Sequence, residues 1–459
     1  MKLELAPTVQ NTTGSYTDFA MFFAYSALYT ASLILLLPYF LLNKEKYLSG
    51  LKQRLGFLPA FIPNGRPVIW VHCVSVGETN AAIPMIEMIR KRYPKYRVVI
   101  STTTKTGQEL AQKLFRNRVD LVFYVPFDIP FIVNRVMRRI KPNVLLIMET
   151  EIWFNLLRSA FKHRSRTVIV NGRLSERSTV RYSKIRFLMK RVFRYVDLAL
   201  MQTSEDAKRL VSLGMRSGKV KVTGNFKFDQ ELETGEQPLT AYFKERFGFD
   251  GASPVIVAAS THSPEERWIL EAFKKIYLTQ TENLPRLILV PRHPERFDEV
   301  DGLIRKTGLN YTRRTAPLGF EDDLVDVLLL DSIGELRSVY PLSDIVFVGG
   351  SLIPHGGQSI LEPALARKTI ITGNSLTNFE SVAREFSEKD AFVRLPELSE
   401  EDVAERLSRE FLKLLKDPEL KERLARNAFT VMHDNRGATA RTLKYLNPFL
   451  RIAGNALTG

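Results

Sequence analysis

Short apolar runs rich in β-branched residues recur along this chain from Val68 onward, and amphipathic stretches separate them. Runs that are apolar throughout are typical of strands buried on both faces of a parallel sheet. The alternation predicts an α/β fold with two doubly wound, Rossmann-like halves. The predicted strands lie at 68–74, 98–102, 121–126, 143–148, 167–171, 197–202 and 219–223, and then at 255–259, 287–290, 325–330, 344–348, 368–372 and 391–395.

A polar stretch, residues 228–253, separates the two series and has the composition of a linker. We therefore predict a first domain over 44–230 and a second over 250–459. The second includes the C-terminal stretch 399–449, whose pattern predicts helices only. At 459 residues, 45% of them hydrophobic, the chain is long enough to bury two cores.

The N-terminal segment is the exception to a soluble chain. Residues 19–42 carry no charge and reach the roughly 20 residues that a membrane span needs. Basic residues follow directly at 44, 46, 52 and 54, which predicts that the rest of the chain lies on the cytoplasmic side. We interpret residues 1–43 as a membrane anchor, either spanning the bilayer or lying in one leaflet.

The net charge of +16 predicts an anionic partner, whether nucleic acid, acidic lipid or a phosphorylated substrate. The basic stretch 181–194 favours an anionic membrane surface if it is an amphipathic helix, and the alternative is a helix packed on its own domain. No nucleic-acid-binding motif accompanies it. The single cysteine, Cys73, lies in an apolar run, which predicts a buried thiol and a reducing compartment.

Two glycine pairs follow the predicted strand 344–348 and precede a helix-like stretch. Glycine lets backbone N–H groups approach a ligand, and a helix N-terminus favours an anion, so Gly349 and Gly350 are candidate contacts of a phosphate or sugar. Glu362, at the start of the helix, is suited to accept hydrogen bonds from two hydroxyls. The alternative is an ordinary turn.

Carboxylates follow two predicted strands of the first half. Glu78 comes after strand 68–74 and is a candidate general base for an acceptor hydroxyl. The alternative is that Glu78 only complements a helix dipole. Glu149 and Glu151 follow strand 143–148, where they either bind hydroxyls or orient a basic residue.

Basic residues also follow strands. Arg173 and Arg177 come after strand 167–171, and Arg292 and His293 after strand 287–290, so each is a candidate phosphate contact. Two further segments, 263–266 and 332–335, carry a serine with a glutamate three residues on, the pattern of a helix capping box.

Taken together, these motifs resemble the Kdo (3-deoxy-D-manno-octulosonic acid) transferases of lipopolysaccharide synthesis. The resemblance implies a GT-B glycosyltransferase at the cytoplasmic face of the bacterial inner membrane, which moves Kdo from CMP-Kdo to a lipid A precursor. It rests on eight ordered segments, 75–78, 148–153, 173–178, 224–229, 259–262, 290–297, 334–336 and 347–352.

The resemblance places the general base at Glu78 and implies three CMP-binding segments, whose residues are Arg292, His293, Ile333, Gly334, Glu335, Ser359, Ile360, Leu361 and Glu362. From their positions after strands, we expect contacts to the acceptor or donor sugar at Glu149, Glu151, Arg173, Arg177, Gly349 and Gly350. The chain departs from the family pattern on the donor side, at 356–362 and 373–379. No Asp-x-Asp pair occurs, so we expect neither a metal nor a cofactor. The alternatives are a UDP-sugar transferase or epimerase, and a non-catalytic membrane-surface binding protein.

Overall fold

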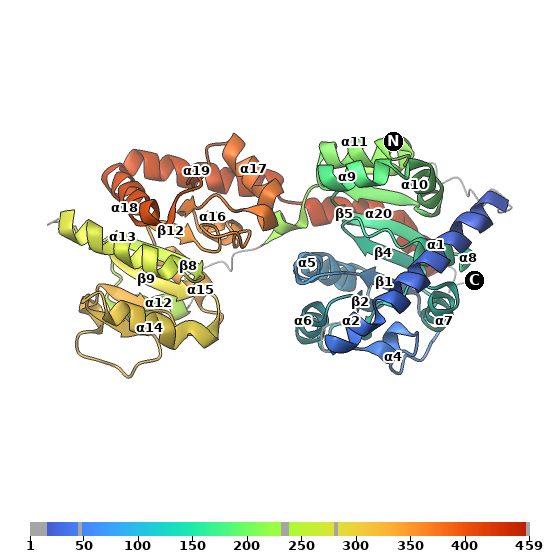
Figure 1. Cartoon of the computed structure of the whole chain (residues 1–459), viewed down its shortest axis with the longest axis horizontal. Coiled ribbons are helices and arrows are strands. Elements are labelled where there is room, and N and C mark those ends of the chain that lie inside the picture. The colour runs from blue at the N-terminus through green and yellow to red at the C-terminus, as the bar shows by residue number, and fades with distance from the viewer. Residues whose placement is uncertain (1–15, 45–47, 231–237, 280–282, 456–459) are drawn as a thin grey trace. The chain divides into compact units, whose positions relative to one another are not determined.

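The computed structural model describes residues 16–44, 48–230, 238–279 and 283–455. Two compact units make up the chain: Met1–Gln230 with Arg436–Gly459, and Glu231–Asn435. Figure 1 shows the elements of each unit, coloured from blue at the N-terminus to red at the C-terminus. Residues 1–15 of the predicted anchor and 231–237 of the predicted linker lie outside the described residues.

The first unit is built on a seven-stranded, all-parallel sheet in the order β3-β2-β1-β4-β5-β6-β7. Its central strands are buried along their whole length, as their apolar sequences predict. The strands are β1 (Val68–His72), β2 (Arg97–Thr102), β3 (Leu121–Tyr124), β4 (Val144–Met148), β5 (Arg166–Gly172), β6 (Leu198–Met201) and β7 (Val220–Val222).

Helices cover this sheet (Figure 1) and close two apolar cores, which include Cys73 as a buried thiol. They are α1 (Tyr16–Leu35), α2 (Leu37–Leu42), α4 (Leu51–Arg54), α5 (Val76–Arg92), α6 (Lys105–Phe115), α7 (Pro130–Ile140), α8 (Phe154–Lys162), α9 (Glu176–Ser183), α10 (Arg186–Val192), α11 (Ser204–Ser212) and α20 (Ala438–Asn455). The basic stretch 181–194 is therefore not one helix, because α9 ends at Ser183 and α10 begins at Arg186.

The C-terminal helix α20 belongs to the first unit, so the predicted boundary of a second domain over 250–459 is wrong at its far end. The carboxylate of Asp229 accepts the N–H groups of Gly437 and Ala438, at 2.6 and 3.2 Å, where α20 begins. Farther along the helix, the hydroxyl of Tyr93 donates to Asn447. These partners are more than 200 residues away in sequence, so local pattern does not indicate them.

The second unit has another seven-stranded, all-parallel sheet, in the order β10-β11-β9-β8-β12-β13-β14. The strand at Tyr311–Arg313 was not predicted, because it is short, polar and only partly buried. The strands are β8 (Val255–Thr261), β9 (Arg286–Pro291), β10 (Tyr311–Arg313), β11 (Val327–Leu329), β12 (Ile345–Val348), β13 (Thr369–Thr372) and β14 (Val393–Arg394).

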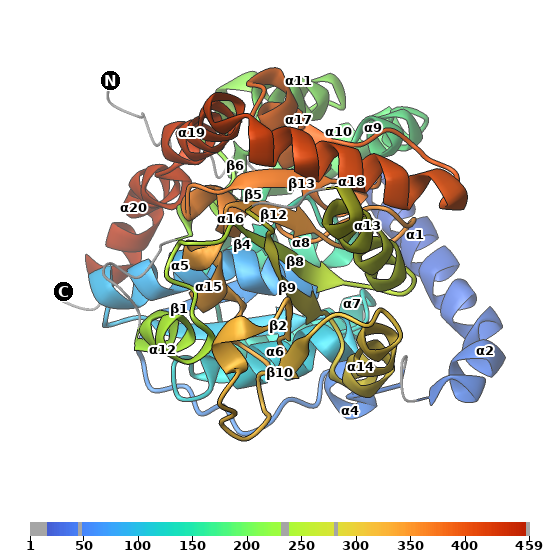
Figure 2. The same ribbon diagram turned by 90° about the vertical axis from the view of Figure 1, so that its left-hand side faces the viewer.

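The helices of the second unit are α12 (Pro238–Phe247), α13 (Glu265–Thr279), α14 (Phe297–Arg305), α15 (Leu336–Val339), α16 (Leu361–Leu365), α17 (Glu380–Glu388), α18 (Glu400–Lys416) and α19 (Pro418–Asn435). Helices α13 and α18 lie side by side (Figure 2), where Phe273 and Phe411 are buried in one core and Lys275 pairs with Glu405. This packing fixes α13, whose first turn forms part of the site described below.

Candidate functional site

Each sheet has a point near its centre at which its strand order reverses. In the first sheet this point lies between β1 and β4, and in the second between β8 and β12. Ligands of open α/β sheets bind at the carboxyl ends of the strands at such a point. The segments that follow these four strands contain Glu78, Glu149 and Glu151 in the first unit, and His262 and Gly349 in the second. The strand order thus points to the same segments as the sequence motifs.

Glu78 lies in the first turn of α5, which begins after the N-cap residue Ser75. Its backbone N–H donates to the Ser75 hydroxyl at 3.3 Å, and its carboxylate accepts the N–H of Val74 at 2.8 Å and the Ser75 hydroxyl at 3.1 Å. This resembles a capping box, except that the glutamate accepts the N–H of the residue before the N-cap, and it holds the carboxylate in a fixed place. The side chain therefore caps α5, and its carboxylate is held at the carboxyl edge of the sheet.

Burial raises the pKa of Glu78, and the negative charges of Glu149 and Glu151 add to this effect against the opposing hydrogen bond from Val74, so that the pKa is about 8. Burial also raises the pKa values of Glu149 and Glu151. A carboxylate with a pKa near the working pH can take a proton from a hydroxyl far better than one with an ordinary pKa. We call these three residues the acidic cluster.

Lys227 lies beside the acidic cluster, and sequence reasoning did not single it out. Its positive charge and that of Arg173 oppose the burial that raises the Glu149 pKa, and burial lowers the pKa of Lys227 itself. The Asn171 side chain accepts the N–H of Phe226 at 3.0 Å and so fastens this segment to the end of β5. Segment 224–229, one of the eight that carry the family resemblance, could have indicated Lys227, because it contains a single lysine between two aromatic residues.

Of the two arginines predicted after β5, Arg173 thus contributes to the electrostatics of the acidic cluster. Arg177 lies in the first turn of α9 and is exposed. Glu149 interacts electrostatically with Arg173 and Lys227, and the role of orienting a basic residue stays a prediction.

Three residues at strand ends have left-handed backbone conformations although they are not glycine. They are Glu149 after β4, Asn171 in β5 and Ser260 in β8, with φ of 54°, 52° and 53°. Such conformations cost free energy and cluster at functional sites. Their places at the carboxyl edges of the two sheets support the assignment of the site to these edges.

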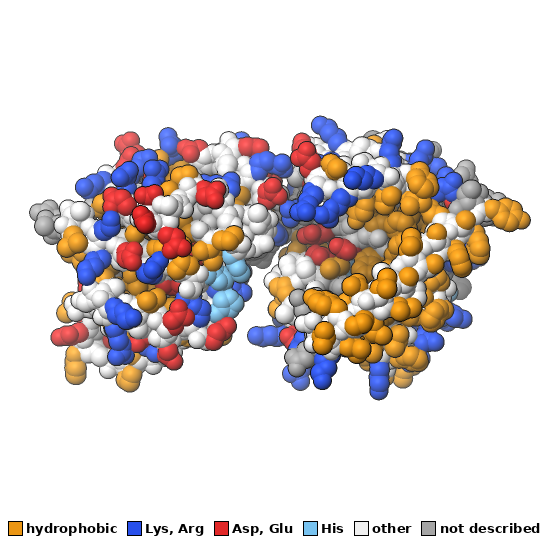
Figure 3. Space-filling view, in the orientation of Figure 1, with side chains coloured by type: hydrophobic (Ala, Val, Ile, Leu, Met, Phe, Trp, Pro, Cys, Tyr) orange, Lys and Arg blue, Asp and Glu red, His pale blue; other side chains and the backbone are white. Residues whose placement is uncertain are grey.

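In the second unit three histidines gather at the sheet edge, and Figure 3 shows histidine side chains grouped on one part of its surface. The ring of His262 lies 4.2 Å from that of His355 and 5.2 Å from that of His293, between ring centres. The side-chain amide of Gln358 lies 3.1 Å from Nε2 of His262. We call His262, His293 and His355 the histidine cluster.

Burial, and after it the electrostatic influence of neighbouring groups with His355 foremost, lowers the pKa of His262 to about 4, so this ring is neutral at pH 7. Arg292 and Arg296 are among those groups. The predicted pair Arg292 and His293 is thereby brought to His262, and both side chains are exposed. Sequence reasoning missed His355, and it placed Gln358 in the span where the chain leaves its family pattern.

The glycine loop after β12 is held by one buried carboxylate. Glu265, at the start of α13, accepts the N–H groups of Gly350 at 2.7 Å, Ser351 at 3.1 Å and Leu352 at 3.0 Å. It also accepts the N–H of His262 at 3.0 Å, and none of its surface is exposed. One side chain thus ties the histidine cluster to the glycine loop.

This arrangement corrects the prediction of a phosphate cradle at Gly349 and Gly350. The Gly349 N–H donates to the carbonyl of Ala259 at 2.8 Å, and the Gly350 N–H is taken by Glu265. A Cβ on Gly349 would lie 2.5 Å from the carbonyl oxygen of Ser260. Gly349 is therefore required for close packing of two strand ends, and neither N–H is available to a ligand.

The two predicted capping boxes of the second unit are also wrong. Helix α13 begins at Glu265, and Glu266 is instead buried in an ion pair with Arg296, at 2.7 Å. Helix α15 begins at Leu336 with Glu335 at its N-cap position and without a side-chain cap, and the Ser332 hydroxyl donates to the Glu335 carboxylate.

An ion pair joins α15, which directly follows segment 333–335, to Glu362 of segment 359–362. Arg337, on α15, donates twice to one oxygen of Glu362, on α16, at 2.9 and 2.8 Å. Glu335 is in turn held by Arg314 at 2.9 Å, whereas Ile333 is exposed. The structure therefore brings together two of the segments predicted to bind a nucleotide, and it leaves one oxygen of Glu362 outside the Arg337 pair.

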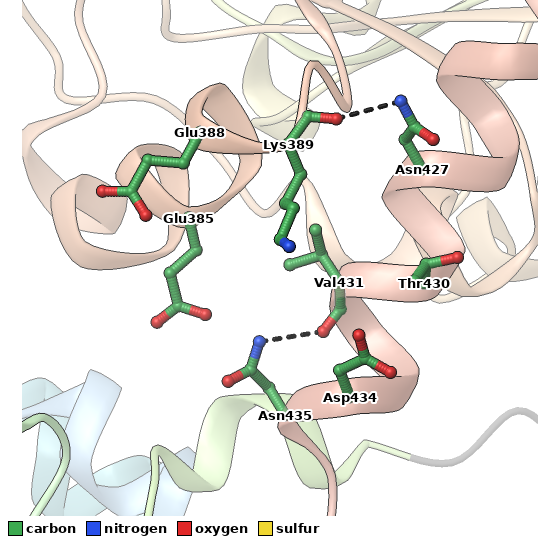
Figure 4. Close-up of a pocket in the computed structure, with 8 residues that line it drawn as sticks. All are labelled: Glu385, Glu388, Lys389, Asn427, Thr430, Val431, Asp434 and Asn435. Atoms are coloured by element: carbon green, nitrogen blue, oxygen red, sulfur yellow. Dashed lines mark hydrogen bonds between the residues drawn. The ribbon is translucent and has the colours of Figure 1, made fainter.

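A cavity of about 200 Å³ lies elsewhere in the second unit, between α17 and α19 (Figure 4). Its lining includes Glu385, Glu388, Lys389 and Asp434, and none of the predicted site residues. Among the described residues no group of three or more His, Cys, Asp or Glu side chains is arranged to hold a metal ion. The absence of a metal from the reaction stays a prediction.

Comparison with known proteins shows which family this chain is similar to. Residues 49–230 match the family described as 3-deoxy-D-manno-octulosonic-acid transferase (kdotransferase). The 3-deoxy-D-manno-octulosonic acid transferase of Haemophilus influenzae is 34% identical over 92% of this chain and 98% of its own length. That of Bordetella pertussis is 33% identical over 83% of this chain and 87% of its own length.

Solved structures give the fold. A glycosyltransferase from Rickettsia africae matches with a TM-score of 0.54 at 13% identity, covering 85% of this chain and 99% of that one. The C-terminal CMP-Kdo binding domain of WaaA from Acinetobacter baumannii is 35% identical, covering 42% of this chain and 95% of that one, with a TM-score of 0.38. Two Rossmann-like units with this strand order, and likeness to such a structure, define a GT-B fold. The chain belongs to the Kdo transferase family.

Proposed function

We propose that this protein transfers Kdo from CMP-Kdo to a lipid A precursor, lipid IVA, in lipopolysaccharide synthesis. Membership of the family supports the donor, since the relatives are named for transfer of this sugar. The observation that carries the proposal is Glu78, a buried carboxylate with a pKa of about 8 at the switch point of the first sheet. A carboxylate so placed is suited to activate a hydroxyl.

The reaction is a single inverting displacement. Glu78 removes the proton of an acceptor hydroxyl as its oxygen bonds to the anomeric carbon of Kdo. The bond from that carbon to the phosphate oxygen breaks, and CMP leaves with the electron pair. Glu149, Glu151, Arg173 and Arg177 are proposed to contact the sugars, and Lys227 joins them because it lies beside Glu149.

In the second unit, Arg292 and His293 are proposed to contact the CMP phosphate, whose negative charge grows as CMP leaves. Ile333, Gly334 and Glu335 with Ser359, Ile360, Leu361 and Glu362 are proposed to hold the rest of the nucleotide. The ion pair between Glu362 and Arg337, two residues after Glu335, supports a common role. Gly349 and Gly350 then act by shaping the loop rather than by donating to a ligand.

The same proposal includes the cytoplasmic face of the bacterial inner membrane as the site of action, with anionic lipids as partners. A net charge of +16 favours both an anionic leaflet and a phosphorylated lipid acceptor. Helix α1 is the one helix among the described residues that is long and apolar enough to cross a membrane, over Asp18–Leu35. We do not propose nucleic acid as a partner.

The donor is tested by thermal unfolding with nucleotides. CMP at about 100 times its Kd is expected to raise the Tm by roughly 5–10 °C, whereas UDP at the same concentration should leave it unchanged. Mass spectrometry of the product from CMP-Kdo and lipid IVA should then show the added Kdo and count its units. Protection by UDP and not by CMP would favour a UDP-sugar transferase or epimerase instead.

The pH dependence of transfer tests the acidic cluster. Because the base must be deprotonated, kcat/KM for the acceptor should rise with pH and level off above about 8, the Glu78 pKa. In Glu149→Gln the midpoint of this rise should move to a lower pH, since the Glu149 charge helps to raise the Glu78 pKa. An unchanged midpoint in Glu149→Gln, measured from pH 5 to 9.5, would argue against Glu78 as the titrating group.

A further inference from the structure

Helix α1 is docked along the first unit rather than standing free of it. Asp18 forms an ion pair with Arg191 of α10 at 2.5 Å. One turn on, Phe22 is buried, with its ring 5.7 Å from that of Tyr195 and the Arg158 guanidinium 4.5 Å from its ring centre. The helix therefore begins with both a charged and an aromatic attachment to the protein.

The next turn is attached by buried polar groups. Asp128 accepts the N–H groups of Asn155 and Leu156 where α8 begins, and its carboxylate also accepts the hydroxyl of Tyr25 at 2.8 Å. The Asn155 amide donates to the hydroxyl of Ser26 at 3.0 Å. A carboxylate that is 1% exposed would lose a hydrogen bond if α1 left this surface, which makes the attachment specific.

The docked residues recur with helical spacing, so one stripe of α1 faces the protein along its length. Partly buried positions continue at Tyr29, Thr30 and Leu33. A helix that spans a bilayer needs roughly 20 residues surrounded by lipid or by other membrane segments. Residues 18–33 of α1 cannot meet this need while they remain on the surface of a water-soluble α/β unit.

The opposite face of α1 is apolar and exposed, and it continues into α2, none of whose residues is buried. Figure 3 shows these hydrophobic side chains as a continuous band across the first unit. Exposed apolar patches of this kind mark lipid or protein contacts. The most exposed members include Phe19, Phe23, Leu28, Leu35, Leu41 and Leu42.

Helix α10 extends this surface. It lies next to α1 through the Arg191 ion pair, and it exposes Phe187 together with Arg186 and Lys190. An apolar face flanked by basic residues is typical of helices that lie in the plane of an anionic leaflet. A protein partner would not need the basic flank, so the charge favours lipid.

We propose that α1, α2 and the exposed side of α10 form one in-plane membrane-binding surface, which enters a single leaflet and does not span the bilayer. The inference deepens the membrane localisation proposed above, whereas its test does not depend on Kdo transfer. In this arrangement both ends of the α1–α2 segment lie on the same side of the membrane.

Labelling of single added cysteines tests the topology. Tyr16→Cys and Asn43→Cys flank the segment, and Glu401→Cys on exposed α18 reports the side of the second unit. The native Cys73 is buried, so the parent protein should not react and serves as the control. A membrane-impermeant maleimide should label all three variants in inside-out inner-membrane vesicles and none in intact spheroplasts.

Labelling of Tyr16→Cys and Asn43→Cys from opposite sides would overturn the inference in favour of a span. Labelling of all three variants in spheroplasts would agree with the in-plane helix and would refute the cytoplasmic face, so the two proposals fail separately.

A second measurement uses vesicles of phosphatidylglycerol and phosphatidylcholine. Leu28→Glu should weaken binding roughly tenfold, and the exposed control Leu318→Glu in the second unit should not. Equal binding by both variants would also overturn the inference.

Discussion

Replacing Glu78 by glutamine is expected to lower kcat of Kdo transfer by about 10²–10⁴-fold, the usual contribution of a general base. Glutamine keeps the size of the side chain and can still accept the N–H of Val74, so the first turn of α5 should stay intact. It cannot take a proton from the acceptor hydroxyl. The measurement is the initial rate with CMP-Kdo and lipid IVA at saturation, at pH 8.

Two comparisons separate loss of the base from loss of the fold. Ser75→Ala removes the hydroxyl that donates to Glu78 and caps its N–H, yet keeps the carboxylate, so it should lower the Tm slightly and retain most activity. CMP binding by Glu78→Gln should be unchanged, since the proposed CMP segments lie in the second unit. Activity of Glu78→Gln within a few-fold of the unsubstituted protein would refute the assignment.

The raised pKa also sets the sign of a stability effect. The folded pKa of Glu78 is about 8 against an ordinary value of 4.5, so the folded state holds this proton over a range in which the unfolded chain has released it. The contribution of protonated Glu78 to stability is complete below pH 4.5 and is lost as pH rises through 8. At pH 9 we therefore expect Glu78→Gln to melt at a higher temperature than the unsubstituted protein.

The sequence predicted the strands well because every central strand is buried on both faces and carries a continuous apolar run. It missed β10, which has no such run. The place of Glu78 was also predictable, because a glycine turn after a buried strand puts the following helix start at the carboxyl edge of the sheet. Family resemblance then supplied its expected role.

Long-range partners account for what the sequence could not predict. The glycine loop has the composition of a phosphate cradle, yet its amides bind Glu265, which lies 85 residues away from Gly350. Glu266 has the spacing of a capping residue, yet Arg296 takes it as a partner. The same holds for α20, whose first amides are satisfied by Asp229 of the first unit. In each case the hydrogen-bond or ion-pair partner is a residue that is distant in sequence and close in the folded structure.

Replacing Glu265 by glutamine is expected to destabilise the second unit and to weaken CMP binding. Each carboxylate oxygen accepts two backbone N–H groups, from His262 and Gly350 on one side and from Ser351 and Leu352 on the other. An amide NH₂ in place of one oxygen cannot accept, so two buried donors lose their partner at a cost of about 2–5 kcal/mol. For a unit of this size the Tm should fall by roughly 5–15 °C.

CMP affinity should fall about tenfold at a temperature well below the melting transition, because the loop that Glu265 holds leads directly to Gln358 and the segment 359–362. Isothermal titration with CMP measures this loss. The matched control is Glu271→Gln on the same helix, whose side chain is 53% exposed and should be near neutral. Glu265→Asp keeps both acceptor oxygens and should recover part of the affinity. A Glu265→Gln protein that melts early but binds CMP with unchanged affinity would show that this carboxylate supports the fold without shaping the donor segment.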